Sequence, residues 1–562
     1  MQFTHFLSFS RHFSTSITTQ LPKLKKITKI PYKYRPRAIQ LAQKEVTNYL
    51  HTTKNLQFTY AELISKNSLF TLHDLMAKVD YSFFEFSDNL QRYLSYYPIN
   101  EFEFFYESIG ISTNEINGFL PRGKFFLDED FGGYSVCCAL WEFGFPWNKL
   151  GVLCKEKDSV FTRSVSEVNE CLSGFKEYGF DGIMIIGVCL AFPFVFSRKC
   201  ALRGEVVALF DVLRIVFLDY ELVKFVDGNV DAWFDVCRKI RVFYDLGCAN
   251  GNMGELLGRS KNVLLEYPEE MLVKKVEFFR KLDVPKEEIG FFLLSKTDIF
   301  EFDLESRCIS VVGILKYFGL EIEKLRSVMR NYPYVLGRNK LANLPHVMRL
   351  LNLNEWFFDR MRNGDHNLLG TYVIGSPDED LDKCYTEYLI KIESLRIPAH
   401  ALCKLNFLHG IGFGQTKLTT KALSNMKCSS AQVQDRFNFL LSCGIAFPNL
   451  CNMIFHSPKI LDQKIELLDQ KVKYLCEDMG CSLQSLDEFP AFLNFDLDKR
   501  IKPRYRFHMW LTENNLCRKK YALTSIISSS EKRFIALIYR MHPAAPKKWL
   551  ASFFKNPGDS IL

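Results

Sequence analysis

Apolar residues recur along the chain at helical spacing, in blocks that glycines separate. In residues 272–282, and again in residues 431–444, they fall three or four positions apart, which predicts amphipathic helices. A glycine follows the first block of a pair and suits a helix end, because a left-handed backbone costs little without a Cβ atom. A second apolar block comes next, so the pattern predicts helical hairpins.

The hairpins repeat with a fixed arrangement. A glycine is followed at once by an apolar residue, a proline comes fourteen positions after the glycine, and two apolar residues follow soon after. The full pattern occurs in Gly179 with Pro193, Gly319 with Pro333, and Gly444 with Pro458. Copies without the proline start at Gly110, Gly144, Gly247, Asp283 and Asn352. The double gap after Gly179 predicts a degenerate unit near residue 213, and further units are expected near 396 and 480.

Each unit has a physical reason to need neighbours. The proline ends the second helix because it cannot continue the hydrogen-bond ladder, and a short 3₁₀ turn can then lead onward. One hairpin cannot bury its own apolar face, whereas stacked hairpins can. The sequence therefore predicts an all-α, superhelical α-solenoid of about ten helix-loop-helix repeats, each of 34–36 residues with a 3₁₀ turn.

The first residues are typical of an organellar import signal. Residues 1–44 contain nine Lys or Arg and no acidic residue, with apolar side chains spaced among Ser and Thr. The segment around Arg11 resembles a mitochondrial processing site and predicts cleavage between Phe13 and Ser14. This favours the mitochondrion, with the chloroplast as the alternative. A disordered basic tail that binds nucleic acid is the competing interpretation.

The predicted organisation has four parts. Residues 1–40 are the import signal and a disordered basic segment, 41–80 an N-terminal extension, 81–512 the repeat array, and 513–562 a basic C-terminal tail. No apolar run is long enough to predict a transmembrane helix, since the longest, residues 183–196, is short and contains a proline. The 17 cysteines form no CxxC pair, so we expect buried reduced thiols and no metal site or cofactor.

Charge is distributed unevenly along the chain. The net charge is +8, residues 1–44 carry +9, and residues 495–562 carry +9, so residues 45–494 carry −10. A solenoid lined throughout by basic repeats should not be acidic over most of its length. The acidic middle therefore argues against simple tight duplex binding and favours weak, RNA-directed or partner-dependent binding.

Three other motifs have a structural interpretation that we prefer. Residues 241–254, RVFYDLGCANGNMG, look like the cofactor loop of an S-adenosylmethionine methyltransferase, but Gly247 falls on the repeat and the neighbours are helical. Residues 410–417, GIGFGQTK, lack the spacing of a phosphate-binding loop. His400 and His409 near Cys403 could be imagined as metal ligands, but a helical repeat explains the region without metal.

The array and its closing segment resemble the mitochondrial transcription termination factor (mTERF) family of organellar nucleic-acid-binding proteins. The resemblance extends from about residue 81 to residue 510 and is carried by NYPYVL (331–336), EYPEEM (266–271), HSPKIL (456–461) and FPAFLNFDLDKRIKPRYRFH (489–508). It implies a superhelical helical fold with nucleic acid along a basic face. It also implies a role in organellar transcription termination or regulation, RNA processing or ribosome assembly.

The densest basic cluster lies in the closing segment, and Lys and Arg bind phosphates by ion pairing and counterion release. The candidate nucleic-acid contacts are Lys499, Arg500, Lys502, Arg504 and Arg506, extended by Lys519 and Lys520, with Arg338 and Lys340 after the Pro333 turn. The alternative for the closing segment is a solvated cap that pairs with Asp496 and Asp498. For Arg338 and Lys340 ordinary surface charge is the preferred interpretation.

The function expected from these features is that of a non-enzymatic regulator of organellar gene expression, a monomer that binds double-stranded DNA, RNA or both. Its partners would be organellar nucleic acid and proteins of the transcription or RNA-processing machinery, without membrane insertion. The alternative is a solenoid scaffold for protein interactions in splicing, ribosome assembly or stress response. A methyltransferase is the remote alternative.

Overall fold

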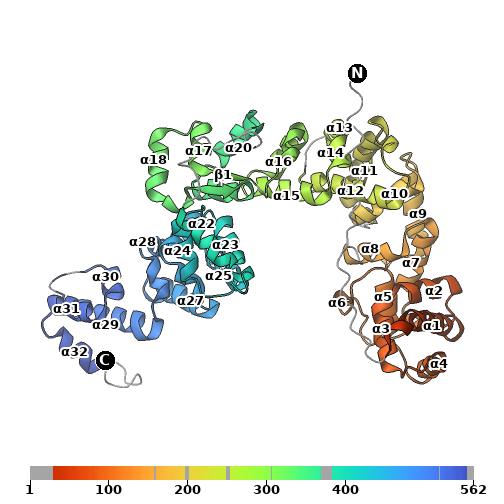
Figure 1. Cartoon of the computed structure of the whole chain (residues 1–562), viewed down its shortest axis with the longest axis horizontal. Coiled ribbons are helices and arrows are strands. Elements are labelled where there is room, and N and C mark those ends of the chain that lie inside the picture. Colours follow the sequence, from red (N-terminus) through yellow and green to blue (C-terminus); the bar gives the residue numbers. More distant parts are fainter. Residues whose placement is uncertain are drawn as a thin grey trace. The chain divides into compact units, whose positions relative to one another are not determined.

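The structure is a computed structural model that describes residues 30–156, 160–196, 201–247, 253–305, 307–367, 369, 383–517, 519 and 521–553. Helices account for most of these residues (Figure 1). The chain forms two compact units, Met1–Leu272 and Val273–Leu562. The predicted cleavage residues Phe13 and Ser14, and the candidate contact Lys520, lie outside the described residues.

The first unit is built from short helices joined by tight turns. Its α-helices are α1 (Arg35–Asn48), α2 (Phe58–Asn67), α3 (Leu69–Lys78), α4 (Phe86–Tyr96), α5 (Glu101–Ser108), α6 (Thr113–Ile116), α7 (Phe131–Phe143), α8 (Leu150–Glu156), α9 (Val165–Lys176), α10 (Gly182–Ala191), α11 (Ala201–Arg214), α12 (Val230–Tyr244), α13 (Met253–Arg259) and α14 (Lys261–Glu266). Its 3₁₀ and π turns are η1 (Tyr32–Tyr34), η2 (Tyr49–Thr53), η3 (Leu127–Glu129), η4 (Trp147–Lys149), η6 (Pro193–Phe196), η7 (Ile215–Asp219) and η8 (Leu222–Lys224).

The second unit has the same kind of architecture. Its α-helices are α15 (Glu269–Arg280, most of which belongs here), α16 (Lys286–Ser295), α17 (Val311–Tyr317), α18 (Ile322–Asn331), α19 (Leu344–Leu350), α20 (Asn354–Arg362), α22 (Lys383–Glu393), α23 (Ala399–Gly410), α24 (Lys417–Asn425), α25 (Ser430–Ser442), α26 (Phe447–His456), α27 (Ile465–Lys473), α28 (Ser485–Glu488), α29 (Lys502–Glu513), α30 (Leu523–Ser528), α31 (Glu531–Met541) and α32 (Ala545–Phe553). Its 3₁₀ and π turns are η9 (Thr297–Glu301), η10 (Pro333–Val335), η11 (Leu341–Asn343), η12 (Asp365–Asn367), η14 (Pro458–Asp462), η15 (Tyr474–Asp478), η16 (Pro490–Asn494) and η17 (Leu497–Ile501).

The predicted repeat is confirmed by the backbone. A left-handed residue occurs at most of the repeat starts read from the sequence, namely Gly110, Gly144, Gly179, Gly247, Asp283, Gly319, Asn352, Gly444 and Gly480. The degenerate unit expected near residue 213 has its left-handed residue at Glu221. The start expected near residue 396 is wrong, because the left-handed residue of that unit is Gly412, 16 residues further along. The three repeat prolines begin the 3₁₀ turns η6, η10 and η14. The all-α repeat fold is therefore confirmed.

Helices also flank the stretch that resembles a methyltransferase loop. α12 precedes Gly247, whose φ of 67° ends the helical segment, and α13 follows. A nucleotide-binding βαβ unit needs a strand where α12 lies. The described residues on both sides of this loop thus form a hairpin of the repeat type.

A buried basic side chain closes most of the later repeats. The donor lies on the first helix of a hairpin, and the acceptor is a backbone carbonyl at the end of the second helix or in the turn after it. The pairs are Lys239–Leu264 (3.0 Å), Lys275–Ile299 (2.9 Å), Lys404–Met426 (3.0 Å), Arg436–Leu461 (2.5 Å), Lys471–Leu493 (2.7 Å) and Arg504–Ser529 (2.6 Å). Carbonyls at a helix end have no helical partner and carry partial negative charge, so an internal cation satisfies both needs.

One small strand pair interrupts the helices of the second unit. β1 (Cys308–Ser310) pairs antiparallel with β2 (Arg338–Lys340), with Ile309 opposite Asn339. The loop of residues 410–417 packs beside β2, because Gly414 N donates to Tyr334 O and Gln415 N donates to Arg338 O, both at 2.9 Å. A Cβ atom on Gly414 would lie 2.4 Å from Leu336 O. The glycines of this loop therefore allow close packing of backbone on backbone.

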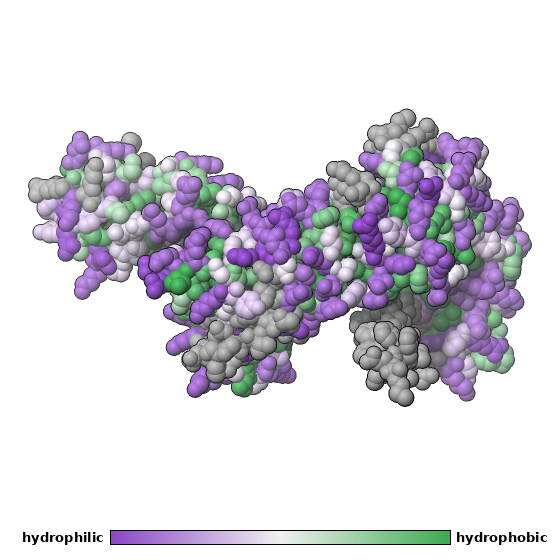
Figure 2. Space-filling view, turned by 90° about the horizontal axis from the view of Figure 1, so that it is seen from above, coloured by the Kyte–Doolittle hydropathy of each residue, from purple (hydrophilic) through white to green (hydrophobic). Residues whose placement is uncertain are grey.

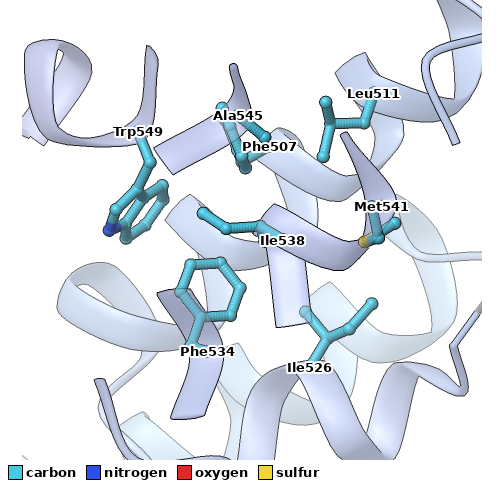
Figure 3. Packing of buried hydrophobic residues seen from close by; sticks show 8 residues of the cluster. All are labelled: Phe507, Leu511, Ile526, Phe534, Ile538, Met541, Ala545 and Trp549. Atoms are coloured by element: carbon cyan, nitrogen blue, oxygen red, sulfur yellow. The ribbon is translucent and has the colours of Figure 1, made fainter. Parts of the chain in front are cut away.

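The segment expected as a basic C-terminal tail contains α30, α31 and α32, which share a hydrophobic core with α29. The side chains of the core are Phe507, Leu511, Ile526, Phe534, Ile538, Met541, Ala545 and Trp549, all buried (Figure 3). Ile538 lies among the others, and the ring centres of Phe534 and Trp549 are 4.9 Å apart. This core fixes the position of α29, the helix that carries the predicted contacts Lys502, Arg504 and Arg506.

The surface is mainly polar. Figure 2 shows hydrophilic residues predominating on the face that it presents, with hydrophobic residues in small separate areas. Among the described residues, no helix combines the length and the hydropathy that a membrane crossing requires.

Acid should weaken the second unit through His346 on α19. Burial, together with the nearby positive charges of Lys281 and Arg349, lowers the pKa of this imidazole to about 3. The imidazole of the unfolded chain takes up a proton below about pH 6.5, whereas the folded imidazole stays neutral. The free energy of unfolding therefore decreases as the pH is lowered through this range. We expect a loss of about 2 kcal/mol between pH 6.5 and pH 5 from this residue.

Denaturant unfolding of the chain across this pH range measures the effect. His346→Gln keeps a polar side chain that does not titrate, so the variant should lose about 2 kcal/mol less than the wild type over the same range. Equal pH dependence of the two proteins would contradict the prediction.

Candidate nucleic-acid interface

The closing segment begins with a capped turn that leads directly into a helix. The carboxylate of Asp496 accepts a hydrogen bond from Lys499 N at 2.7 Å and so caps η17. α29 continues from η17, and its second residue is Pro503, which is tolerated there because the first turn needs no amide donor. The five predicted cations of this segment therefore lie on one nearly continuous helix.

Helix periodicity divides these five cations into two sets. Residues seven apart lie on the same side of a helix, so Lys499 and Arg506 share a face with Lys502 between them. Lys499 and Arg506 are exposed and Lys502 is half-buried, and we call these three the cation row. Arg500 and Arg504, four residues apart, point toward α30, and we call them the arginine clamp. The sequence placed all five in one cluster, but the structure separates them.

The arginine clamp holds the carboxyl end of α30. The Arg504 guanidinium donates to the carbonyl oxygens of Ile526 (3.1 Å), Ile527 (3.2 Å) and Ser529 (2.6 Å). Arg500 donates to Ile527 O at 2.9 Å and to Ser529 O at 2.7 Å. These bonds satisfy carbonyls that the helix end leaves without helical partners.

An ion pair extends the clamp to the last two helices. Arg504 Nη2 lies 2.7 Å from Glu531 Oε2, and the other oxygen of Glu531 accepts from Trp549 Nε1 at 2.8 Å. The guanidinium carbon is 4.4 Å from the centre of the Phe534 ring, and only 4% of the Arg504 side chain is exposed. Arg504 thus connects α29 with α30, α31 and α32.

This geometry corrects part of the predicted site. Arg504 is buried with its donors directed to backbone and Glu531, so it presents no face to a phosphate. Arg500 is half-buried, stacks 4.1 Å over Phe495, and is also occupied by carbonyls. Burial lowers the pKa of the Arg500 guanidinium, and the nearby charge of Arg504 lowers it further. Both arginines therefore act inside the fold, and we leave them out of the interface.

The cation row is the part of the cluster that faces solvent. Lys502 Nζ lies 2.6 Å from Asp498 Oδ1, so one of its three charges has an acidic neighbour, as the alternative of a solvated cap expected. Arg506 approaches the Tyr474 phenol; burial raises the pKa of this phenol, and the positive charge of Arg506 partly offsets the rise. Exposed cations along one helix face have the spacing and the freedom to bind a polyanion.

A further cation reaches this region from the end of the chain. Lys548 on α32 is exposed, and its Nζ lies 5.5 Å from the centre of the Trp510 ring, one turn beyond Arg506 on α29. The sequence analysis did not select Lys548, because its position depends on how Trp549 packs into the C-terminal core. Lys519 is also exposed, 5.6 Å from the centre of the Tyr521 ring.

The other two predicted contacts lie elsewhere in the second unit. Arg338 and Lys340 are both half-buried on β2, and their side chains share one face of the strand because they are two residues apart. Asn339, between them, is completely buried on the other face. The structure therefore brings Arg338 and Lys340 together as a pair on β2, on a different element from the cation row.

The structure places the three residues considered as metal ligands, His400, Cys403 and His409, in different environments. The two ring nitrogens of His409 lie 2.9 Å from the Tyr385 hydroxyl and 2.7 Å from Phe413 O. Burial also lowers the pKa of His409. The ring is thus a hydrogen-bonded core residue, whereas His400 and Cys403 are exposed.

Comparison with known proteins identifies the family. The sequence model of the mTERF family matches residues 234–354 and 403–535. The mitochondrial transcription termination factor MTEF18 of Arabidopsis thaliana is 44% identical over 548 residues, which cover 98% of this chain and 97% of that protein. The chain belongs to the mTERF family. The second matched segment of the mTERF model contains the whole cation row and the arginine clamp.

Other mTERF relatives match over shorter segments. The chloroplastic transcription termination factor MTERF8 of A. thaliana is 25% identical and covers 50% of this chain and 52% of its own length. The mitochondrial factor MTERF15 of the same plant is 20% identical and covers 55% of this chain and 56% of its own length. The mitochondrial location predicted for this mTERF protein is confirmed by the near full-length similarity to MTEF18.

Proposed function

We propose that this mTERF protein binds mitochondrial nucleic acid through the cation row and regulates mitochondrial gene expression without catalysing a reaction. The observation that supports the proposal is the outward face of α29, on which Lys499, Lys502 and Arg506 are supported from behind by the arginine clamp. Phosphate contacts of this kind give affinity and register, whereas sequence choice needs base contacts from other residues.

Duplex DNA is the form that suits the row best. Three cations along one rigid helix meet phosphates at fixed intervals, and a duplex presents its phosphates as regularly spaced rows. Lys548 from α32 extends the same region, and Lys519 adds a charge beyond the end of α29. Arg338 and Lys340 stay a second, separate candidate contact on β2.

Salt dependence of binding tests the proposal. The chain from Ser14 onward is titrated with labelled mitochondrial duplex DNA and with RNA at several salt concentrations. Three phosphate contacts should give a slope of log affinity against log salt of roughly −2.7 or steeper with duplex DNA. If the protein binds neither duplex DNA nor RNA at low salt, the proposal is contradicted.

A protein-interaction scaffold is the second candidate. It is favoured by one observation, the net charge of −10 in residues 45–494, which does not attract a polyanion. Stacked hairpins provide extended surfaces for proteins as well as for nucleic acid. Recovery of stable protein complexes from a chain that binds no nucleic acid would favour this candidate over the first.

A further inference from the structure

Aromatic rings collect on the surface at the start of the first unit. They come from two segments, residues 32–34 and residues 81–84, and we call them the aromatic platform: Tyr32, Tyr34, Tyr81, Phe83 and Phe84. The most exposed are Tyr32, at 84%, and Phe84, at 89%. Single exposed aromatic residues are ordinary on a protein surface, whereas several that adjoin one another mark a binding surface.

The rings of the platform contact one another. The centre of the Tyr34 ring lies 5.1 Å from that of Phe83 and 6.4 Å from that of Tyr81, and Phe83 and Phe84 are 5.0 Å apart. The two segments that carry them are held by α1 and α4, which pack against each other at the start of the chain (Figure 1). Ser87 Oγ on α4 donates to Glu45 Oε1 on α1 at 2.7 Å. The platform is therefore fixed by the helices beneath it.

Basic side chains lie directly over these rings. The Arg37 guanidinium carbon is 4.8 Å from the centre of Phe83, and that of Arg35 is 5.5 Å from the centre of Tyr32. Lys33 Nζ is 5.9 Å from the centre of the Tyr34 ring. Planar rings with cations at their faces thus form one mixed surface.

We propose that the aromatic platform binds single-stranded nucleic acid by stacking its bases on the exposed rings, while Lys33, Arg35 and Arg37 contact the backbone phosphates. Unpaired bases have open π-faces, and stacking of a base on an aromatic ring combined with nearby cations is the usual chemistry of single-strand binding. A duplex keeps its bases stacked inside, so it cannot use the rings. The site thereby differs in ligand from the cation row.

The same surface fits an anionic membrane less well. Membrane-inserting surfaces combine aromatic rings with aliphatic side chains, whereas the exposed large apolar residues in 30–37 and 80–86 are aromatic. Asp80 and Glu85 are exposed beside the rings, and a negatively charged lipid surface would repel them. A nucleic-acid strand avoids this conflict, because its bases can lie on the rings while its phosphates point toward the cations.

The platform is independent of the proposed duplex site. It lies in the first unit, outside residues 234–354 and 403–535 that the mTERF model matches. The platform shares no residue with the cation row, so failure of one site in its test would leave the other site unaffected.

Binding of labelled oligouridine RNA and oligothymidine DNA to the full chain, followed by fluorescence anisotropy, tests the platform. Tyr32→Ala combined with Phe84→Ala should weaken single-strand binding roughly tenfold or more. Tyr32→Phe combined with Phe84→Tyr keeps both rings and should bind like the wild type. Since both side chains are largely exposed, neither pair should change the unfolding transition or the affinity for duplex DNA.

The matched control is an aromatic pair at the other end of α4. Tyr96 and Tyr97 are 80% and 58% exposed, and their replacement by alanine should leave single-strand binding unchanged. Equal loss in the control, or no loss in the platform variant, would overturn the proposal. So would binding to vesicles of anionic phospholipid that depends on the same rings when neither oligonucleotide binds. The RNA and DNA arms show which strand the rings prefer.

Discussion

Arg504→Ala lowers the free energy of unfolding of the C-terminal core by about 2–3 kcal/mol, whereas Arg506→Ala changes it by less than about 0.5 kcal/mol. The first substitution removes the buried guanidinium that donates to three carbonyls and to Glu531, and it leaves a cavity beside Phe534. Arg500 keeps its bonds to two of these carbonyls, Ile527 O and Ser529 O. The second removes an exposed side chain from the opposite face of α29. Two arginines that are two residues apart should thus give very different results.

Chemical unfolding followed by tryptophan fluorescence measures this difference. Trp510 and Trp549 lie at the C-terminal core and report on it. Arg504→Lys is an intermediate test, because it keeps the charge but loses the planar fork that reaches several carbonyls. Equal unfolding curves for Arg504→Ala and Arg506→Ala would show that the clamp does not hold the core.

Replacement of Lys499, Lys502 and Arg506 by glutamine should nearly abolish duplex binding. With three fewer phosphate contacts, the salt dependence of log affinity should become shallower by roughly 2.7, and affinity at 50 mM salt should fall by about 10²- to 10³-fold. The lower end of this range of affinity loss applies if Lys502 contributes little, because its neighbour Asp498 already offsets part of its charge. Stability should change little, because these side chains face solvent.

A matched triple variant separates this effect from a simple change in net charge. α18 carries Lys324, Arg326 and Arg330, all exposed, within seven residues of one helix. Their replacement by glutamine removes the same three charges and should leave duplex affinity and its salt dependence close to the wild-type values. If both triple variants lose affinity equally, the charge of the whole unit, rather than the cation row, controls binding.

The repeat could be predicted from the sequence because its signals are local. Gly179, Gly319 and Gly444 allow a left-handed backbone through their own chemistry, and the following prolines end a helix wherever they occur. The structure confirms each of these starts. Even Asp283 and Asn352 could be placed, since the fixed interval compensated for the missing glycine.

The division of the basic cluster could not be predicted in the same way. Which side of α29 is buried depends on α30, α31 and α32, a segment for which the sequence predicts only a basic tail. Arg500 and Arg504 have the same chemistry as Arg506, so composition cannot separate them. Lys239, Lys275, Lys404 and Arg436 each stand eight residues before a left-handed residue. Arg504 stands eleven residues before Asn515, so this regularity does not extend to the closing segment.

The buried cations bear on how the number of hairpins in such an array can change during evolution. An ammonium or guanidinium group that meets its carbonyl in one arrangement would be stranded in hydrocarbon if its hairpin slipped by a single turn. Slippage between modules of the same pattern is thereby penalised by a residue inside each module. Duplication of a module also copies its buried cation and the carbonyl that the cation binds. The number of modules can therefore change while each new module still packs in the correct register.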